Sequence, residues 1–290
     1  MLVSPQHPHV VTRRCGGTTG ARPNQSRIRE SFFKTITFSS FPLCDEMRLM
    51  KTHPIITGLR ITATLLAFAS AIAFAGEKKS GEARGPYHPA IEPANFTHVV
   101  TNPYFPLVPG TTTTFTEKEG RETRENKVTV THDTKTIMGV KCVVVHDTVT
   151  LNGKLVEDTF DWYAQDKQGA VWYFGEDTKE FKAGGRVSTE GSWEAGVNGQ
   201  PGIMMPANPK PGEPYRQEYS PNTAEDMGQV VAVGETVTVP AGTYKDCVKT
   251  KDWSLLELGH ENKWYAKGVG VVRSQNTAGE VSTLVSVARK

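Results

Sequence analysis

Apolar and polar residues alternate over short stretches from about residue 103 to the end of the chain, and turn-forming residues separate these stretches every eight to twelve positions. The stretches are rich in Thr, Val, Tyr, Phe and Trp, the residues that β-strands favour. No apolar stripe with helical spacing persists long enough to indicate a substantial helix. The pattern predicts an all-β, mainly antiparallel fold with few short helices, and its clearest strands are expected at 128–137, 141–150 and 229–239.

Landmarks in the first half of this region recur in the second half in the same order, at offsets of 102 to 105 residues. They predict a duplicated β-meander, with copies at about 103–195 and 204–290, within one β domain of residues 95–290. We expect the copies to join into a curved sheet or open barrel, with 196–212 as a Pro- and Gly-rich crossing loop. The matching landmarks are Pro109-Gly110 with Pro211-Gly212, Gly139 and Cys142 with Gly242 and Cys247, and Trp162-Tyr163-Ala164 with Trp264-Tyr265-Ala266.

An uncharged apolar run at 61–75 follows three basic residues and ends in a small-x-small triplet before Gly76. This is the anatomy of a secretory signal peptide, which we place at 47–75 with cleavage between Ala75 and Gly76. The run is shorter than the roughly 20 apolar residues that span a bilayer, so no membrane span is expected in the mature protein. The sequence predicts a bacterial protein that is periplasmic or secreted by a Sec-type route.

Residues 1–46 are rich in Pro, Arg and Ser and show no hydrophobic periodicity, so we interpret them as a disordered or wrongly assigned extension. The true start of translation is left open between Met1, Met47 and Met50. Residues 76–94 are interpreted as a flexible leader. Without residues 1–75 the chain keeps 24 basic and 28 acidic residues, a net charge of −4, which argues against a nucleic-acid partner.

Two cysteines remain after the signal peptide, Cys142 and Cys247, at matching places in the two repeats. An even count in an oxidising compartment favours a disulfide between them, which we predict. The alternative is two separately buried thiols on Val-rich strands.

The segment 157–180 carries seven acidic residues against two lysines and is expected to form a hairpin that turns at 167–169. Strand alternation places Asp161 and Tyr163 on one face, with Trp162 and Ala164 on the other. One interpretation is a sugar or Ca²⁺ site. We favour cross-strand aromatic packing with a solvated acidic edge, because the spacing of calcium-binding loops is missing. The candidate oxygen ligands are Asp161, Asp166, Glu176 and Asp177.

No nucleophile elbow, phosphate-binding loop or dinucleotide-binding motif occurs, and no histidine lies at a zinc-ligand spacing. We therefore predict no catalytic residue, metal or cofactor, and do not favour an enzyme.

Several phrases resemble a group of uncharacterised exported proteins and lipoproteins of bacteria, over about residues 95–290. They are YFPL with PG at 104–110, DWYAQD at 161–166, VWYFGE at 171–176 and WYAKGVGV at 264–271. The VPAGT phrase at 239–243 and YAKGVGV are also similar to envelope proteins with a LolA/LolB-like curved sheet, which carry lipid-modified proteins in an apolar concavity. The resemblance implies export and supplies no catalytic residue.

The function we favour is a non-enzymatic binding module for an apolar or amphipathic envelope ligand, such as a lipid or another apolar small molecule. Aromatic strands and the apolar part of the junction loop are the expected binding surface, with Met204, Met205, Trp162, Trp172 and Tyr173 as candidate contacts. Two alternatives stay open. One is a carbohydrate-active enzyme or a glycan- or Ca²⁺-binding protein using hairpin 157–180, and the other is a structural or interaction protein without a pocket.

Overall fold

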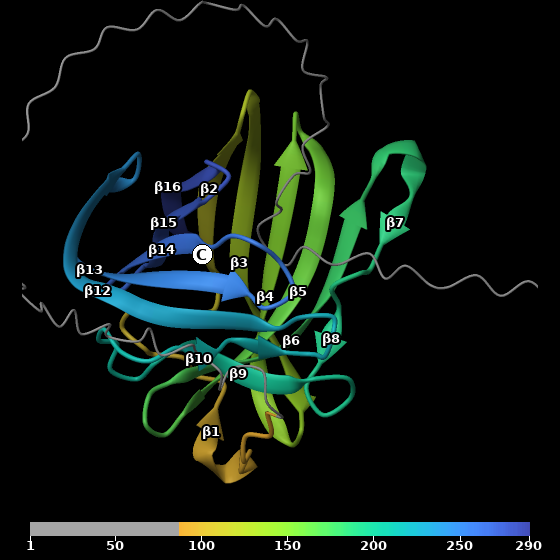
Figure 1. Cartoon of the computed structure of the whole chain (residues 1–290), viewed down its shortest axis with the longest axis vertical. Coiled ribbons are helices and arrows are strands. Elements are labelled where there is room, and N and C mark those ends of the chain that lie inside the picture. Colours follow the sequence, from red (N-terminus) through yellow and green to blue (C-terminus); the bar gives the residue numbers. More distant parts are fainter. Residues whose placement is uncertain (1–86) are drawn as a thin grey trace, which may run out of the picture.

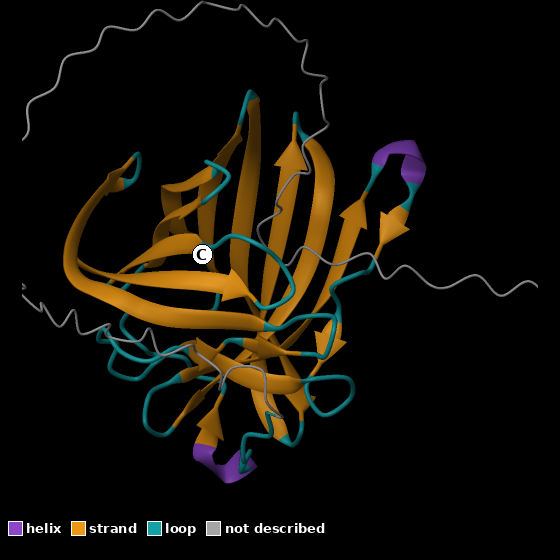
Figure 2. Ribbon diagram, in the orientation of Figure 1, coloured by secondary structure: helices purple, strands orange, loops and turns teal. Residues whose placement is uncertain are grey.

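A computed structural model describes residues 87–290, which consist almost entirely of antiparallel strands (Figure 2). The helical elements of this part are two short 3₁₀ turns, η1 (Pro93–Asn95) and η2 (Ala183–Gly185). No helix among these residues is long and apolar enough to cross a membrane. The predicted all-β, antiparallel fold is confirmed. The predicted signal peptide, its cleavage site at Ala75 and Gly76, and residues 1–46 lie outside the described residues.

The first half folds into a meander in which each long strand pairs with the next. Its tightest turns use the residues that such turns require. Asn152-Gly153 and Met138-Gly139 both have positive φ at two successive positions, as two-residue hairpin loops demand. The strands are β2 (Thr111–Glu119), β3 (Glu122–Ile137), β4 (Val140–Leu151), β5 (Lys154–Asp166) and β6 (Val171–Phe181).

The second half forms another antiparallel meander, with shorter strands after its first hairpin. Its strands are β12 (Asp226–Val239), β13 (Gly242–Ser254), β14 (Glu261–Ala266), β15 (Gly270–Asn276) and β16 (Val281–Arg289). Of the repeat landmarks, Cys142 lies on β4 and Trp162-Tyr163-Ala164 on β5, while Cys247 lies on β13 and Trp264-Tyr265-Ala266 on β14. The two Pro-Gly pairs lie outside the strands. The duplication itself stays a prediction.

The last strand joins the two meanders, because β16 pairs with β2 from Val281↔Lys118 to Arg289↔Thr111. The sheet therefore runs without interruption from β12 to β6, and the two meanders face each other in Figure 1. Short elements flank this path: β1 (Phe96–Thr97), β7 (Val187–Ser188), β8 (Trp193–Glu194), β9 (Gln200–Met205), β10 (Tyr215–Arg216) and β11 (Glu218–Tyr219).

The segment 215–219 nearly closes the sheet into a barrel, since β10 pairs with β12 at one edge and β11 pairs with β9 at the other. Close approach requires glycine on both sides. A Cβ on Gly202 would lie 2.4 Å from the Gln217 carbonyl oxygen, and one on Gly228 would lie 2.7 Å from the Gln217 Nε2. The expected crossing loop 196–212 was thus wrong in part, because its apolar residues Ile203 and Met205 pair with the otherwise open edge of β6.

The predicted disulfide is wrong. Cys142 on β4 and Cys247 on β13 are free, fully buried, and belong to different apolar clusters of the core. Their strands are not neighbours in the sheet, so matching positions in the two meanders do not bring the sulfurs together. Burial raises the pKa of the Cys142 thiol to about 12 and also raises that of Cys247. Both are small apolar core residues, as the alternative proposed.

Candidate functional site

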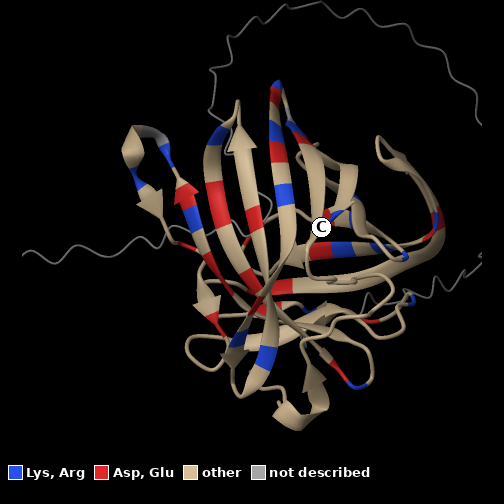
Figure 3. Cartoon of the chain, turned by 180° about the vertical axis from the view of Figure 1, so that it is seen from behind, with Lys and Arg blue, Asp and Glu red and all other residues tan. Residues whose placement is uncertain are grey.

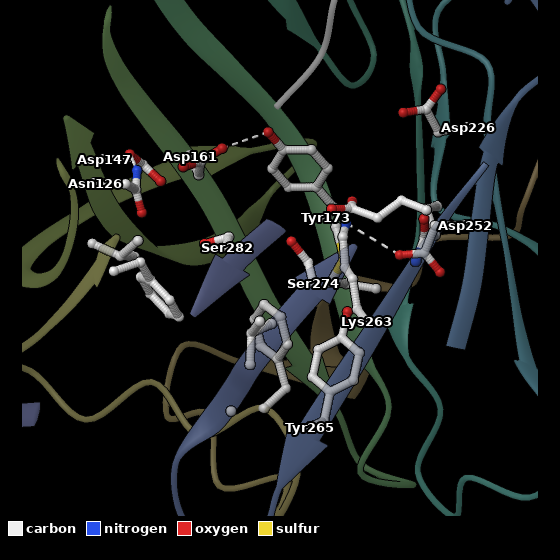
Figure 4. A pocket seen from close by; sticks show the side chains of 18 of the residues that line it. Asn126, Asp147, Asp161, Tyr173, Asp226, Asp252, Lys263, Tyr265, Ser274 and Ser282 are labelled. Carbon is white, nitrogen blue, oxygen red and sulfur yellow. Dashed lines mark hydrogen bonds and ion pairs between the residues drawn. The ribbon is translucent and has the colours of Figure 1, made fainter. Parts of the chain in front are cut away.

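The two meanders enclose a cavity of about 260 Å³. Strands of both halves line it, together with the segment 105–107 and the β13–β14 loop at 257–260. Figure 4 shows polar side chains on both sides of this space, with Asp147 and Asp161 on one side and Asp226 and Asp252 on the other. The cavity is the candidate site because it combines a packed apolar surface with buried ionisable groups.

Phe105 forms part of the apolar lining and reaches both halves of the protein. Its ring centroid lies 5.4 Å from that of Tyr163 and 6.4 Å from that of Tyr265. Phe115 on β2 and Val271 on β15 line the same space, so each meander supplies apolar surface. Tilted aromatic pairs at these centroid separations are a favoured packing arrangement of aromatic rings.

Four buried carboxyl groups from β4, β5, β6 and β11 form what we call the acidic cluster: Asp147, Asp161, Glu176 and Glu218. Tyr173 lies at its centre. The Tyr173 hydroxyl donates to Asp161 Oδ1 at 2.6 Å and lies 3.1 Å from Glu176 Oε2. Trp193 Nε1 donates to Glu218 Oε2 at 3.0 Å. The cluster is therefore held in place by neutral donors.

A β-bulge at Gly175 turns Glu176 toward Tyr173. The register shifts between the Asp161↔Glu176 and Tyr163↔Tyr173 pairs, so residues three apart on β6 share one face. Gly175 has φ of +127°, and a Cβ there would lie 2.2 Å from the Trp193 carbonyl oxygen. Glycine at this position is what makes the bulge compatible with β8 beside it.

Asp147 has one oxygen without a hydrogen-bond partner. Asn126 Nδ2 donates to its Oδ1, whereas Oδ2 is buried and has none, and the residue is 1% exposed. Burial raises the pKa of Asp147 well above its usual value, and the nearby Asp161, Glu157 and Glu117 raise it further. Buried polar atoms are rarely left without a partner, so this oxygen marks a place where a ligand can donate.

Burial also raises the pKa of Asp161, to about 8, although the hydrogen bond from Tyr173 lowers it. The charged groups that act on it, Glu218 and Glu157, are acidic and raise it further. At neutral pH Asp147 and Asp161 therefore retain protons that free carboxyl groups would have lost.

On the opposite side, β14 presents an ion pair. Lys263 Nζ lies 3.1 Å from Asp252 Oδ2 and 3.6 Å from Glu261 Oε2. Burial opposes the charge of Lys263, but the two carboxyl groups outweigh it and raise its pKa. Burial raises the pKa of Glu261 to about 8 although Lys263 lowers it.

Acidic residues greatly outnumber basic residues in the described lining of the cavity. Among the described residues that line it, eight are acidic and one, Lys263, is Lys or Arg. Along the long strands as a whole, blue and red positions are interspersed in Figure 3. The acidic lining residues are Glu117, Asp147, Asp161, Glu218, Asp226, Asp252, Glu257 and Glu261.

No protein-family model and no curated protein matches this chain. Among solved structures, it is similar to a candidate exported protein with a YmcC-like fold from Bacteroides fragilis, with 19% identity and a TM-score of 0.41, over 64% of this chain and 99% of that one. It is also similar to a candidate lipoprotein from Parabacteroides distasonis, with 14% identity and a TM-score of 0.36, over 64% and 98% of the two chains. No function can be transferred at this level of similarity.

The structure separates the predicted ligand contacts. Met204 and Tyr173 line the cavity, whereas Met205 is fully buried in the core. Trp162 and Trp172 do not line it. Lys135 Nζ lies 3.4 Å from the centre of the Trp162 ring, and Trp172 Nε1 donates to Asp166 at 2.8 Å.

The acids predicted to form a sugar or Ca²⁺ site are separated as well. Asp161 and Glu176 meet at Tyr173, but Asp166 caps the β5–β6 turn by accepting from the Ala170 N–H, and Asp177 is exposed. Within residues 87–290, no group of three or more His, Cys, Asp or Glu side chains is placed to hold a metal ion. The predicted solvated acidic edge is wrong for Asp161 and Glu176, because their exposed fractions are 1% and 3%.

Sequence reasoning missed the second wall of the cavity. Glu261, Lys263 and Tyr265 alternate along β14, and all three line the site. A charged pair at a spacing of two residues, followed by an aromatic residue on the same face, was the available signal. Nothing in the sequence indicated that Asp252, on the neighbouring strand β13, would be their partner.

Proposed function

We propose that this chain is a non-enzymatic, exported bacterial protein that binds one small amphipathic molecule inside its barrel. The observation that carries the proposal is the cavity of about 260 Å³, which presents apolar side chains and buried carboxyl groups to the same occupant. Pockets with a mostly apolar lining and a few convergent polar groups are the usual form of small-molecule sites.

The buried acids support binding rather than packing alone. Burying a carboxyl group without full hydrogen bonding costs free energy, and Asp147 is such a group because its Oδ2 has no partner. An apolar side chain at this position would stabilise the free protein more. The presence of this carboxyl group in the cavity is accounted for if an occupant supplies the missing polar contact.

The size of the cavity limits the occupant. Pockets that bury a drug-sized molecule usually measure roughly 300–1,000 Å³, and this one is slightly smaller. A molecule with one short alkyl chain or one small ring system fits this space better than a lipid with two long chains.

The two alternatives have less support. A glycan or Ca²⁺ site on hairpin 157–180 needs acids that the fold places apart, with Asp166 in the turn and Asp177 exposed. A purely structural protein has no use for an internal cavity lined by ionisable groups. Export is inferred from the signal-peptide pattern at 47–75.

Native mass spectrometry of the protein purified from the cells that make it tests the proposal. We expect a small-molecule adduct on the wild-type protein. Val128 lines the cavity, so Val128→Trp should fill it and remove the adduct. The control is Val233→Trp on β12, because Val233 is 50% exposed and lies outside the lining.

The control variant should retain the adduct. A clean mass for the wild-type protein, together with no binding of short-chain amphiphiles added to it, would reject the proposed function. An adduct that persists in Val128→Trp at the wild-type level would place the binding site elsewhere.

A further inference from the structure

Resting on the proposed function, we propose that the ligand is a cation: a small amine whose ammonium group lies beside Asp147 and Asp161 and whose apolar part packs against Phe105 and Phe115. The proposal names the charge and chemical class of the occupant. Four observations support it.

The first is the charge of the lining. Eight acidic residues and one lysine face the cavity, so each acid that ionises makes the potential inside more negative, and a low-dielectric surrounding strengthens its effect. The positive charge of Lys263 is already matched by Asp252 and Glu261 at 3.1 and 3.6 Å. An anionic ligand would meet unfavourable charges on most of the wall, whereas a cation would meet favourable ones.

The second is the unsatisfied oxygen of Asp147. Its Oδ2 is buried and lacks a hydrogen-bond donor, while Oδ1 accepts from Asn126. An ammonium group carries donors and no acceptor, which is the complement of a carboxylate oxygen. Hydrogen bonds between such charged partners are shorter and stronger than neutral ones.

The third is the sign of the charges that act on these two acids within the described residues. The charged groups that act on Asp147 are Asp161, Glu157 and Glu117, and those that act on Asp161 are Glu218 and Glu157. All of them are acidic. A bound ammonium group would place a positive charge next to these acids. Lys263 of the described part lies across the cavity, beside Asp252 and Glu261.

The fourth is the aromatic surface next to the acids. Tyr163 and Tyr173 stack with centroids 4.7 Å apart and line the cavity beside Asp161. Phe105 packs on Tyr163, so an alkyl or aryl group attached to the amine continues onto apolar surface.

Isothermal titration of the naturally processed protein with octylamine, octanol and octanoate at pH 7 tests the inference. The three probes share a chain and differ in charge. We expect octylamine to bind at least about tenfold more tightly than the other two, the effect of one charge-assisted hydrogen bond. Asp147→Asn and Asp161→Asn should each reduce octylamine affinity by about that factor and reduce octanol affinity by less.

The matched control is Asp177→Asn, which removes the same charge from the exposed side of β6. It should bind all three probes like the wild-type protein. Octylamine affinity should also rise between pH 5 and pH 8, because the amine stays charged while the cavity acids lose protons. Octanol affinity should not follow pH in this way.

The outcomes separate the two proposals. Equal affinity for octylamine and octanol, or tightest binding of octanoate, would overturn the cationic ligand and leave the binding function standing. Loss of octylamine binding in Asp177→Asn to the same degree as in Asp147→Asn would also overturn it, since a general charge effect would then explain the data. No binding of any probe, with a clean native mass, would overturn both.

Discussion

At the scale of single residues, two carboxyl groups of the acidic cluster lie next to one hydroxyl group. Tyr173 has one hydroxyl proton, and its oxygen lies within hydrogen-bonding distance of both Asp161 and Glu176. One of the two carboxyl groups can accept that proton, and the other can donate to the hydroxyl oxygen when it is itself protonated. Burial raises the pKa of Asp161 to about 8, so the free protein holds a protonated acid here at neutral pH.

This protonation makes stability depend on pH. The unfolded chain loses the Asp161 proton near pH 4, whereas the folded protein retains it to about pH 8. The contribution of Asp161 to the free energy of unfolding should therefore fall by on the order of a few kcal/mol as pH rises between these values. It should level off above pH 8.

Urea unfolding of the wild type and of Asp161→Asn at pH 5 and pH 8 measures this effect. The variant should lose less stability than the wild type on going to pH 8. Asp177→Asn, altered at an exposed position, should retain the wild-type dependence. Parallel pH profiles for the wild type and Asp161→Asn would show that Asp161 is ionised in the folded protein.

Cys142 and Cys247 give a second prediction at this scale. Both are buried with raised pKa values, and thiolates are the reactive form. A thiol-alkylating reagent should modify them slowly in the folded protein and rapidly in urea without a reductant. Peptide mass spectrometry reads the result, and a peptide pair linked through these two residues would contradict it.

At the scale of elements, the bulge of β6 sets the composition of the site. Regular alternation would put Glu176 on the face opposite Tyr173, away from the cavity. The extra residue at Gly175 brings it to the same face, and β8 packs against that point. The bulge thus links strand geometry to the number of acids inside the barrel.

Gly175→Ala should be strongly destabilising, by a few kcal/mol, because its Cβ would lie 2.2 Å from the Trp193 carbonyl oxygen at a positive φ. Gly153→Ala is the matched control. It also has positive φ, +75°, but nothing lies within 4 Å of the added carbon, so about 1 kcal/mol is expected. Equal losses in urea unfolding would mean that the contact with β8 does not restrict this position.

At the scale of the whole molecule, two meanders joined through β16 and β2 and nearly closed by 215–219 surround one cavity. The all-β fold, the β5–β6 hairpin and the shared face of Asp161 and Tyr163 followed from strand alternation, but that face was expected to be solvated and is buried. The position of Glu176 did not follow from alternation, because a single glycine shifts the register. The disulfide prediction failed because matching positions in the two meanders need not meet.

The side of the cavity formed by β13 and β14 could not be predicted from the sequence, for a related reason. Asp252 and Lys263 are partners on adjacent strands, but their approach to Asp147 and Asp161 depends on how the sheet curves. Curvature arises from bulges in β12 and β13 and from the short segment that bridges β9 and β12. These features are spread over distant residues and leave no local pattern.

If the ligand binds in the interior of the barrel, a crystal structure of the protein soaked with octylamine should show it there. We expect density for the probe inside the cavity, with its nitrogen within about 3.2 Å of a carboxyl oxygen of Asp147 or Asp161 and its chain against Phe105 and Phe115. A cavity filled by the protein's own side chains, or a probe bound only on the outer surface, would contradict it.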